Sequence, residues 1–100
     1  MASIAEFEII DAKGASVPHD AWSFVSVSSE ETVKEDASAE NAIDGQTANF
    51  WHTRWGDGHP KGPHYLVIDM GAEVEVAGFR YTPRQDMPNG RVRAWRFYVP

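Results

Sequence analysis

The chain of 100 residues contains no cysteine. Disulfide bonds, a thiolate nucleophile and a cysteine-ligated zinc site are therefore excluded, and the redox compartment is left open. Stability has to come from a hydrophobic core, and the length is that of a single small domain. We predict one domain over residues 1–100.

Long apolar runs are missing too. No stretch approaches the roughly 20 consecutive apolar residues of a membrane-spanning helix. The N-terminal MASIAEFEII also lacks the basic start and the cleavage site of a signal peptide. No membrane partner is expected, and if the parent protein is exported, its signal precedes this chain.

Basic residues are few. Nine Lys and Arg stand against fifteen Asp and Glu, so the net charge is -6. Affinity for nucleic acid comes mainly from basic side chains that neutralise phosphates, so no nucleic-acid partner is expected. The hydrophobic share of 42% and the charged share of 24% are ordinary for a soluble globular protein.

Signals of catalysis are also absent. The sequence has no G-x-S-x-G turn and no glycine-rich phosphate loop. Solvated strand edges explain its neighbouring carboxylates best. His59 and His64 lie five residues apart in a loop rich in Pro and Gly, a spacing without regular ligand geometry for a transition metal. We therefore predict a non-catalytic protein.

Alternation of apolar and polar residues with period two is abundant. It predicts strands at 4–10, 21–27, 65–70, 74–82 and 91–99. The stretch 84–90 ends in Asn-Gly, which favours an antiparallel hairpin over 79–99 with a long tip. A turn or two of helix is expected around 38–43. The fold class is all-β.

The stretch NAIDGQTAN at 41–49 offers oxygen ligands in a tight loop. The carboxylate of Asp44, the amide oxygens of Gln46 and Asn49 and turn carbonyls are groups that calcium prefers. An Asx turn closed by Asp44 explains the same residues equally well. Spacing alone leaves both interpretations open.

The stretch WHTRW at 51–55 concentrates aromatic and polar side chains. A neutral sugar has hydroxyls that bond to Arg, Asn and His, and a C–H face that packs on an indole ring. The candidate residues for such a site are His52, Trp55, Arg84 and Asn89, with Glu30 or Glu31 as an addition.

Each of these residues also has a structural interpretation. Trp55 could cover the end of a sandwich, His52 could be a satisfied buried imidazole, and Arg84 could pair with Asp86. The residues alone do not decide between sugar binding and these structural roles.

The motifs and their order resemble the discoidin family. They are SFVSVSSEE (23–31), AENAIDGQTANFWHTRW (39–55), PHYLVIDMG (63–71), GFRYTPRQD (78–86) and NGRVRAWRFYV (89–99). The family is also called the coagulation factor V and VIII type C domain, and its bacterial branch is the family 32 carbohydrate-binding modules. The resemblance covers nearly all of residues 22–99.

The resemblance implies a galactose-binding-domain-like jelly-roll β-sandwich. Its implied function is a non-catalytic module that tethers a secreted glycoside hydrolase to glycans ending in galactose or N-acetylgalactosamine, in an extracellular or periplasmic parent protein. Trp51 should then point into the core. The sugar-binding residues carried onto this chain are His52, Trp55, Arg84, Asn89 and Glu30, with Glu31 as the alternative to Glu30.

The resemblance also implies a structural calcium ion. Its ligands would be the side chains of Asp44 and Asn49 and the carbonyls of Asn41 and Gln46. The family supplies a further ligand, a Glu, from a late segment that is absent here.

Family members continue beyond Val99 with several more strands. A sandwich without them would expose strand edges and an apolar face. We therefore expect self-association or a complementing chain that completes the sheets. The alternative function is a fragment that self-assembles or binds protein without binding sugar.

Overall fold

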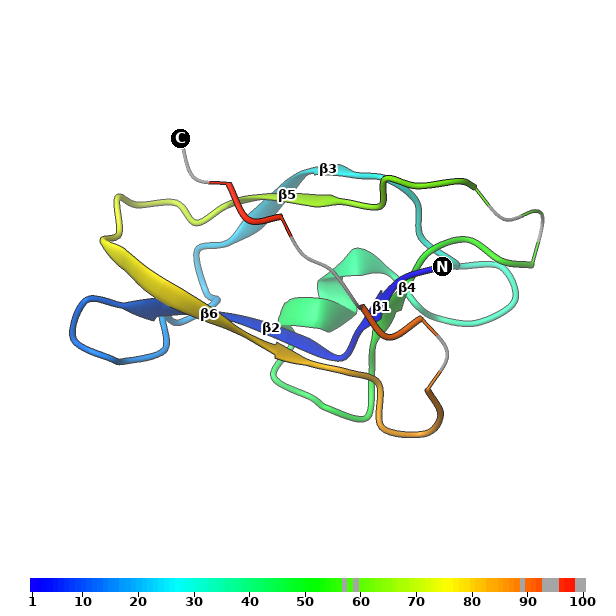
Figure 1. The fold of residues 1–100 in the computed structure, drawn as a ribbon, viewed down its shortest axis with the longest axis horizontal. Helices are drawn as coiled ribbons and strands as arrows, with labels where there is room; N and C mark the ends of the chain where they lie inside the picture. The colour runs from blue at the N-terminus through cyan, green and yellow to red at the C-terminus, as the bar shows by residue number, and fades with distance from the viewer. Residues whose placement is uncertain (57, 59, 89, 93–95, 99–100) are drawn as a thin grey trace.

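The structure is a computed structural model that describes residues 1–56, 58, 60–88, 90–92 and 96–98. Short strands joined by long loops make up the fold (Figure 1). The elements, in chain order, are β1 (Ser3–Ile4), β2 (Glu6–Asp11), β3 (Ser23–Val27), the 3-10 helix η1 (Ala39–Ile43), β4 (Trp51–His52), β5 (Leu66–Asp69) and β6 (Val76–Thr82). The all-β prediction is confirmed.

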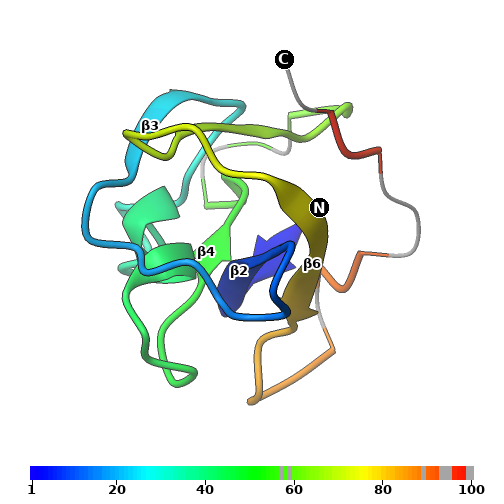
Figure 2. The ribbon, with the colours of Figure 1, turned by 90° about the vertical axis from the view of Figure 1, so that its left-hand side faces the viewer.

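The strands form three antiparallel pairs. In the described residues, β2 pairs with β6, β3 with β5, and β1 with β4. Figures 1 and 2 both show the β3–β5 pair and the β2–β6 pair as separate layers, with η1 between them. This arrangement is a β-sandwich, as the resemblance implied.

Alternation along β2 and β6 sorts their side chains onto two faces. Phe7 lies opposite Tyr81 and Ile9 opposite Phe79, and these four side chains belong to the core or pack against it. The rings of Phe7 and Phe79 stack with centroids 5.7 Å apart. The opposite face carries polar groups, including the exposed ion pair between Arg80 and Glu8.

The predicted hairpin over 79–99 is wrong in its pairing. The strand β6 pairs with β2, and residues 91–92 and 96–98 have no strand structure; 93–95 and 99 lie outside the described residues. The described residues of this segment instead contact β6 through side chains. The Val92 N–H donates to the hydroxyl of Tyr81 at 3.3 Å, and the ring of Phe97 stacks on Phe79 with centroids 4.9 Å apart.

Trp51 points into the core, as the resemblance implied. Its exposed fraction is 2%, and its indole N–H donates to the Ser29 carbonyl at 2.8 Å. Trp55, four residues later, is only partly buried. In the part of the chain that the structure describes, no helix is long and apolar enough to cross a membrane.

Replacing Trp51 by Ala should lower the free energy of unfolding by about 3–5 kcal/mol, the typical cost of truncating a large buried aromatic side chain. Trp55→Ala is the matched control and should cost clearly less, because its ring is already partly in water. Urea denaturation followed by circular dichroism measures both. Equal losses in the two variants would contradict the assignment of Trp51 to the core and Trp55 to the surface.

Candidate functional site

The strand β1 brings two distant loops to one end of the sandwich. Ser3 pairs with His52 of β4 on one side, and its N–H donates to the Gly90 carbonyl at 2.8 Å on the other. The segment 51–55 and the turn 84–90 therefore flank the same short strand. A side chain at Gly90 would not fit, because its Cβ would lie 2.7 Å from the Ser3 hydroxyl oxygen.

Trp55 meets an acidic residue that the sequence did not single out. Its indole N–H donates to Oε1 of Glu35 at 2.7 Å. Glu35 also acts on Arg84: the hydrogen bond to Asp86 raises the pKa of Arg84 above its usual value, and the charge of Glu35 adds to this effect. Trp55 and Glu35 are thus in direct contact, and the charge of Glu35 also acts on Arg84.

The guanidinium of Arg84 is fixed from two sides. It donates from Nε and Nη2 to the two carboxylate oxygens of Asp86, at 2.7 and 2.8 Å. Its Cζ lies 4.0 Å from the centre of the Phe50 ring. Arg84 is 5% exposed, whereas the side chain of Asp86 is half-exposed. Arg84 therefore pairs with Asp86, as its structural interpretation predicted. This pairing holds the guanidinium in one orientation.

His52 is buried, with an exposed fraction of 2%. Its ring Nδ1 lies 2.6 Å from the Thr53 carbonyl. A carbonyl only accepts hydrogen bonds, so in the neutral ring Nδ1 carries the proton and Nε2 is the acceptor. The imidazole is held in one orientation, and the structural interpretation of His52 as a satisfied buried imidazole is realised.

The two acids of the SSEE stretch, Glu30 and Glu31, differ in burial and in hydrogen bonding. Glu31 is 1% exposed, and its carboxylate accepts hydrogen bonds from the backbone N–H groups of Val33, Lys34, Trp55 and Gly56. The N–H of Lys34, followed by those of Gly56 and Trp55, lowers the pKa of Glu31 to about 2. Glu31, the alternative to Glu30, is therefore a structural acceptor and not a group that faces a ligand.

Glu30 itself is half-buried. Among the contacts of the described residues, none joins Glu30 to Trp55 or Arg84; that place belongs to Glu35. Asn89, the last of the predicted sugar-binding residues, lies outside the described residues. Little in the sequence points to Glu35, because it stands in an acidic stretch that is typical of a solvated surface.

The loop predicted to bind calcium is built around Asp44. One oxygen of its carboxylate accepts from the Gln46 N–H and the other from the Asn49 amide, both at 2.9 Å. The Gln46 carbonyl accepts the Asn49 N–H at 3.3 Å. The Asn41 amide donates to the carbonyls of Asp36 and Phe50, which closes the base of the loop. The Asx turn is therefore present.

A buried carboxylate from β2 enters the same loop. Glu6 is 6% exposed and accepts the Gly45 N–H at 2.7 Å. Burial, followed by the hydrogen bond between Glu6 and Asp44, raises the pKa of Glu6 to about 7. Two carboxylates in contact repel each other unless a proton or a cation lies between them.

This donor set fits a hard cation. The described residues contain no group of three or more His, Cys, Asp or Glu that could hold a metal. A site here would therefore combine the carboxylates of Glu6 and Asp44 with amide and carbonyl oxygens, which is how proteins bind calcium. The Asn49 amide can contribute its oxygen if it rotates.

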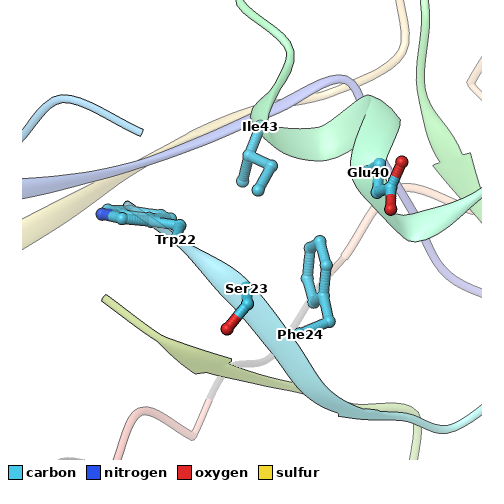
Figure 3. A pocket seen from close by; sticks show the side chains of 5 residues that line it. All are labelled: Trp22, Ser23, Phe24, Glu40 and Ile43. Carbon is cyan, nitrogen blue, oxygen red and sulfur yellow. The ribbon is translucent and has the colours of Figure 1, made fainter. Parts of the chain in front are cut away.

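One hollow is lined by none of these residues. It has a volume of about 470 Å³ and lies between β3 and η1, lined by Trp22, Ser23, Phe24, Glu40 and Ile43 (Figure 3). Figure 3 shows the side chains of Trp22, Phe24 and Ile43 along its wall, together with the polar side chains of Ser23 and Glu40. A smaller hollow of about 330 Å³ is lined by Thr47, Ala48, Gln85 and Asp86. It connects the loop of Asp44 with the partner of Arg84.

Comparison with known proteins identifies a family and several relatives. The F5/8 type C domain family matches residues 24–100. A sialidase from Micromonospora viridifaciens is 40% identical over 78 residues, 77% of this chain and 12% of the relative. A galactose oxidase from Gibberella zeae is 46% identical over 55 residues, 54% of this chain and 8% of the relative.

A lacto-N-biosidase from Bifidobacterium bifidum is 32% identical over 74 residues, 72% of this chain and 7% of the relative. The chain therefore spans only 7 to 12% of the length of these three relatives. The similarity concerns a small part of each of these proteins.

The low pKa of Glu31 makes a prediction about acid stability. Its folded pKa, about 2, lies below the ordinary value of 4.5, so its contribution to stability is complete above pH 4.5 and is lost as the pH falls towards 2. Glu31→Gln lacks this contribution. The difference in free energy of unfolding between wild type and Glu31→Gln should shrink over this pH range in chemical denaturation, and a constant difference would contradict the assignment.

Proposed function

Because the chain belongs to the F5/8 type C, or discoidin, domain family, we propose that it is a non-catalytic carbohydrate-binding module that recognises galactose-type glycan termini. The contact of the partly exposed Trp55 indole with Glu35, together with the guanidinium of Arg84 that Asp86 holds in place, is the observation that carries the proposal. Three relatives that share this region are named as enzymes acting on sugars: a sialidase, a galactose oxidase and a lacto-N-biosidase.

Four side chains supply complementary chemistry for a neutral sugar. The partly exposed indole of Trp55 gives a flat apolar surface for the C–H face of a pyranose ring. Arg84 donates hydrogen bonds, while Glu35 and the Nε2 of His52 accept them. Galactose suits this set, because its axial C4 hydroxyl leaves the opposite face of the ring as one C–H surface.

Affinity for a single sugar should be low. About a dozen heavy atoms at roughly 0.3 kcal/mol each give near -4 kcal/mol, a dissociation constant in the millimolar range. Useful retention then depends on several copies or on a tethered catalytic domain. This is consistent with an accessory module of an extracellular glycoside hydrolase, a role in which the module itself performs no chemistry.

The sugar site predicts a specific effect of Arg84. Arg84→Ala and Trp55→Ala should abolish the galactose-dependent shifts in a protein NMR titration. The first variant removes the hydrogen-bond donor for the sugar, and the second removes the apolar surface under its ring. Arg80→Ala is the matched control: Arg80 lies on the same strand but pairs with Glu8 on the exposed face. Glucose, the C4 epimer, should produce weaker shifts in the wild type.

Two outcomes would contradict this site. A folded Arg84→Ala variant that keeps the wild-type shifts would show that galactose binds elsewhere. An Arg80→Ala variant that loses them would show that the effect of Arg84 is not local.

A second candidate function is association between chains. Val25 on β3, Val67 on β5 and Tyr65 just before β5 are exposed by 68, 44 and 46%. Apolar side chains on a short two-stranded layer favour contact with another chain. The same samples distinguish the two functions. An NMR titration without shifts for every sugar tested, together with a sedimentation coefficient that depends on protein concentration, would favour association.

We also propose that the loop 44–49 binds calcium. The side chains of Asp44 and Asn49 and the carbonyls of Asn41 and Gln46 would hold the ion, joined by the carboxylate of Glu6. Bound calcium would supply positive charge that neutralises the contact between Glu6 and Asp44. Phe50, directly after this loop, packs on Arg84, so an ordered loop would also steady the sugar-binding guanidinium.

Calcium should raise the midpoint temperature of unfolding. At a concentration a hundredfold above the dissociation constant, the gain is about 2.7 kcal/mol, which is about 10 °C or more for a domain of this size. Glu6→Gln should lose most of this rise, although it keeps an acceptor for the Gly45 N–H and a donor towards Asp44. Differential scanning fluorimetry with calcium, magnesium or a chelator measures the effect.

Glu8→Gln is the control for this experiment, because Glu8 lies on the same strand and the same face but pairs with Arg80 at the surface. It should respond to calcium as the wild type does. A wild type that gains nothing from calcium would refute the calcium site, and an equal gain in Glu6→Gln would remove Glu6 from it.

A further inference from the structure

The carboxylate of Glu31 accepts hydrogen bonds from both loops of the candidate sugar site. One of its oxygens accepts the N–H of Val33 at 3.0 Å and that of Lys34 at 2.9 Å. The other accepts the N–H of Trp55 at 3.0 Å and that of Gly56. A single side chain, 1% exposed, therefore ties the turn at 33–35 to the segment 55–56.

The backbone of Glu31 joins the same region. Its N–H donates to the His52 carbonyl at 3.0 Å, and its carbonyl accepts the Ala37 N–H at 2.9 Å. The His52 N–H in turn donates to the Ala37 carbonyl at 3.2 Å. Three candidate ligand-binding side chains, those of Glu35, His52 and Trp55, consequently project from segments that Glu31 bonds directly or borders.

Gly56 shows how closely these segments approach one another. A Cβ at this position would clash with the Lys34 Cγ and would lie 3.0 Å from Oε1 of Glu31. Only glycine leaves room for the two loops at this separation. The close approach brings Oε1 of Glu35 within 2.7 Å of the Trp55 indole nitrogen.

We propose that Glu31 is a positioning residue for the sugar site: its carboxylate sets the relative placement of Trp55 and Glu35, and it does not contact the sugar. The chemistry explains why a carboxylate stands here. Four converging N–H groups need two acceptor oxygens, and an ionised carboxylate has only acceptors. An amide would aim its own N–H groups at two of the four donors.

The functional part of this proposal rests on the galactose site proposed above, whereas the structural part can be tested without sugar. Glu31→Gln is the test variant, since it keeps size and shape but replaces one acceptor by a donor. Glu8→Gln is the matched control, since Glu8 is an acid of β2 that pairs with Arg80 at the surface.

Two NMR measurements on the protein without sugar report on positioning. In Glu31→Gln, the hydrogen exchange of the Trp55 and Gly56 amides should accelerate by about tenfold or more, because charge-assisted bonds are lost. The indole N–H resonance of Trp55 should also move, because its bond to Glu35 depends on the loop geometry. Amides of the β2–β6 pair, such as those of Ile9 and Phe79, should keep their protection, which a general loss of stability would not allow.

Galactose titration then measures the functional consequence. The dissociation constant of Glu31→Gln should rise about tenfold, while Glu8→Gln stays at the wild-type value. If the wild type binds no galactose, the sugar proposal fails, yet the exchange and indole measurements still decide whether Glu31 positions Trp55. An unchanged indole resonance and unchanged Trp55 exchange in folded Glu31→Gln overturn the positioning role.

Gly56→Ala covers the case in which Glu31→Gln does not fold. It leaves the carboxylate intact but forces Lys34 and the 55–56 segment apart, so the Trp55 indole resonance should move in the same direction and galactose affinity should fall. A folded Gly56→Ala variant with the wild-type indole resonance and affinity would contradict the proposal.

Discussion

The buried carboxylate of Glu31 is the interaction on which the proposed sugar site depends. A carboxylate with an exposed fraction of 1% is costly unless hydrogen bonds replace its water, and here four backbone N–H groups do so. Those donors belong to two loops that carry no regular structure of their own. The bonds therefore satisfy the charge and order the loops at the same time.

Charge is paired in the same way elsewhere at this end of the molecule. Asp86 and the Phe50 ring hold the guanidinium of Arg84, and the indole N–H of Trp55 meets Glu35. Glu6 and Asp44 bring two carboxylates into contact at the neighbouring loop. Because Phe50 follows that loop, the proposed calcium ion and the proposed sugar would bind to surfaces joined by one aromatic ring. A shallow module without a deep pocket gains pre-organisation from such links.

The sequence predicted the regular parts well and the long-range pairing less well. Alternation identified β2, β3, β5 and β6, and the short helical turn was expected where η1 lies. The hairpin over 79–99 was wrong because alternation reveals which face of a strand is buried but not which strand lies beside it. Tertiary packing decides which segment lies beside β6, and residues 6–11 pair with it.

The sequence by itself determined the fold class, the family and the burial of Trp51, because these follow from local periodicity and from motifs with fixed spacing. Only the tertiary structure decided which acid meets Trp55, that Glu31 turns inward, and that Glu6 reaches Asp44 while Glu8 stays at the surface. The two acids of β2 share one strand face, so periodicity cannot separate them. What separates them is the loop that packs over Glu6, and its position depends on contacts between residues 39 positions apart in the chain.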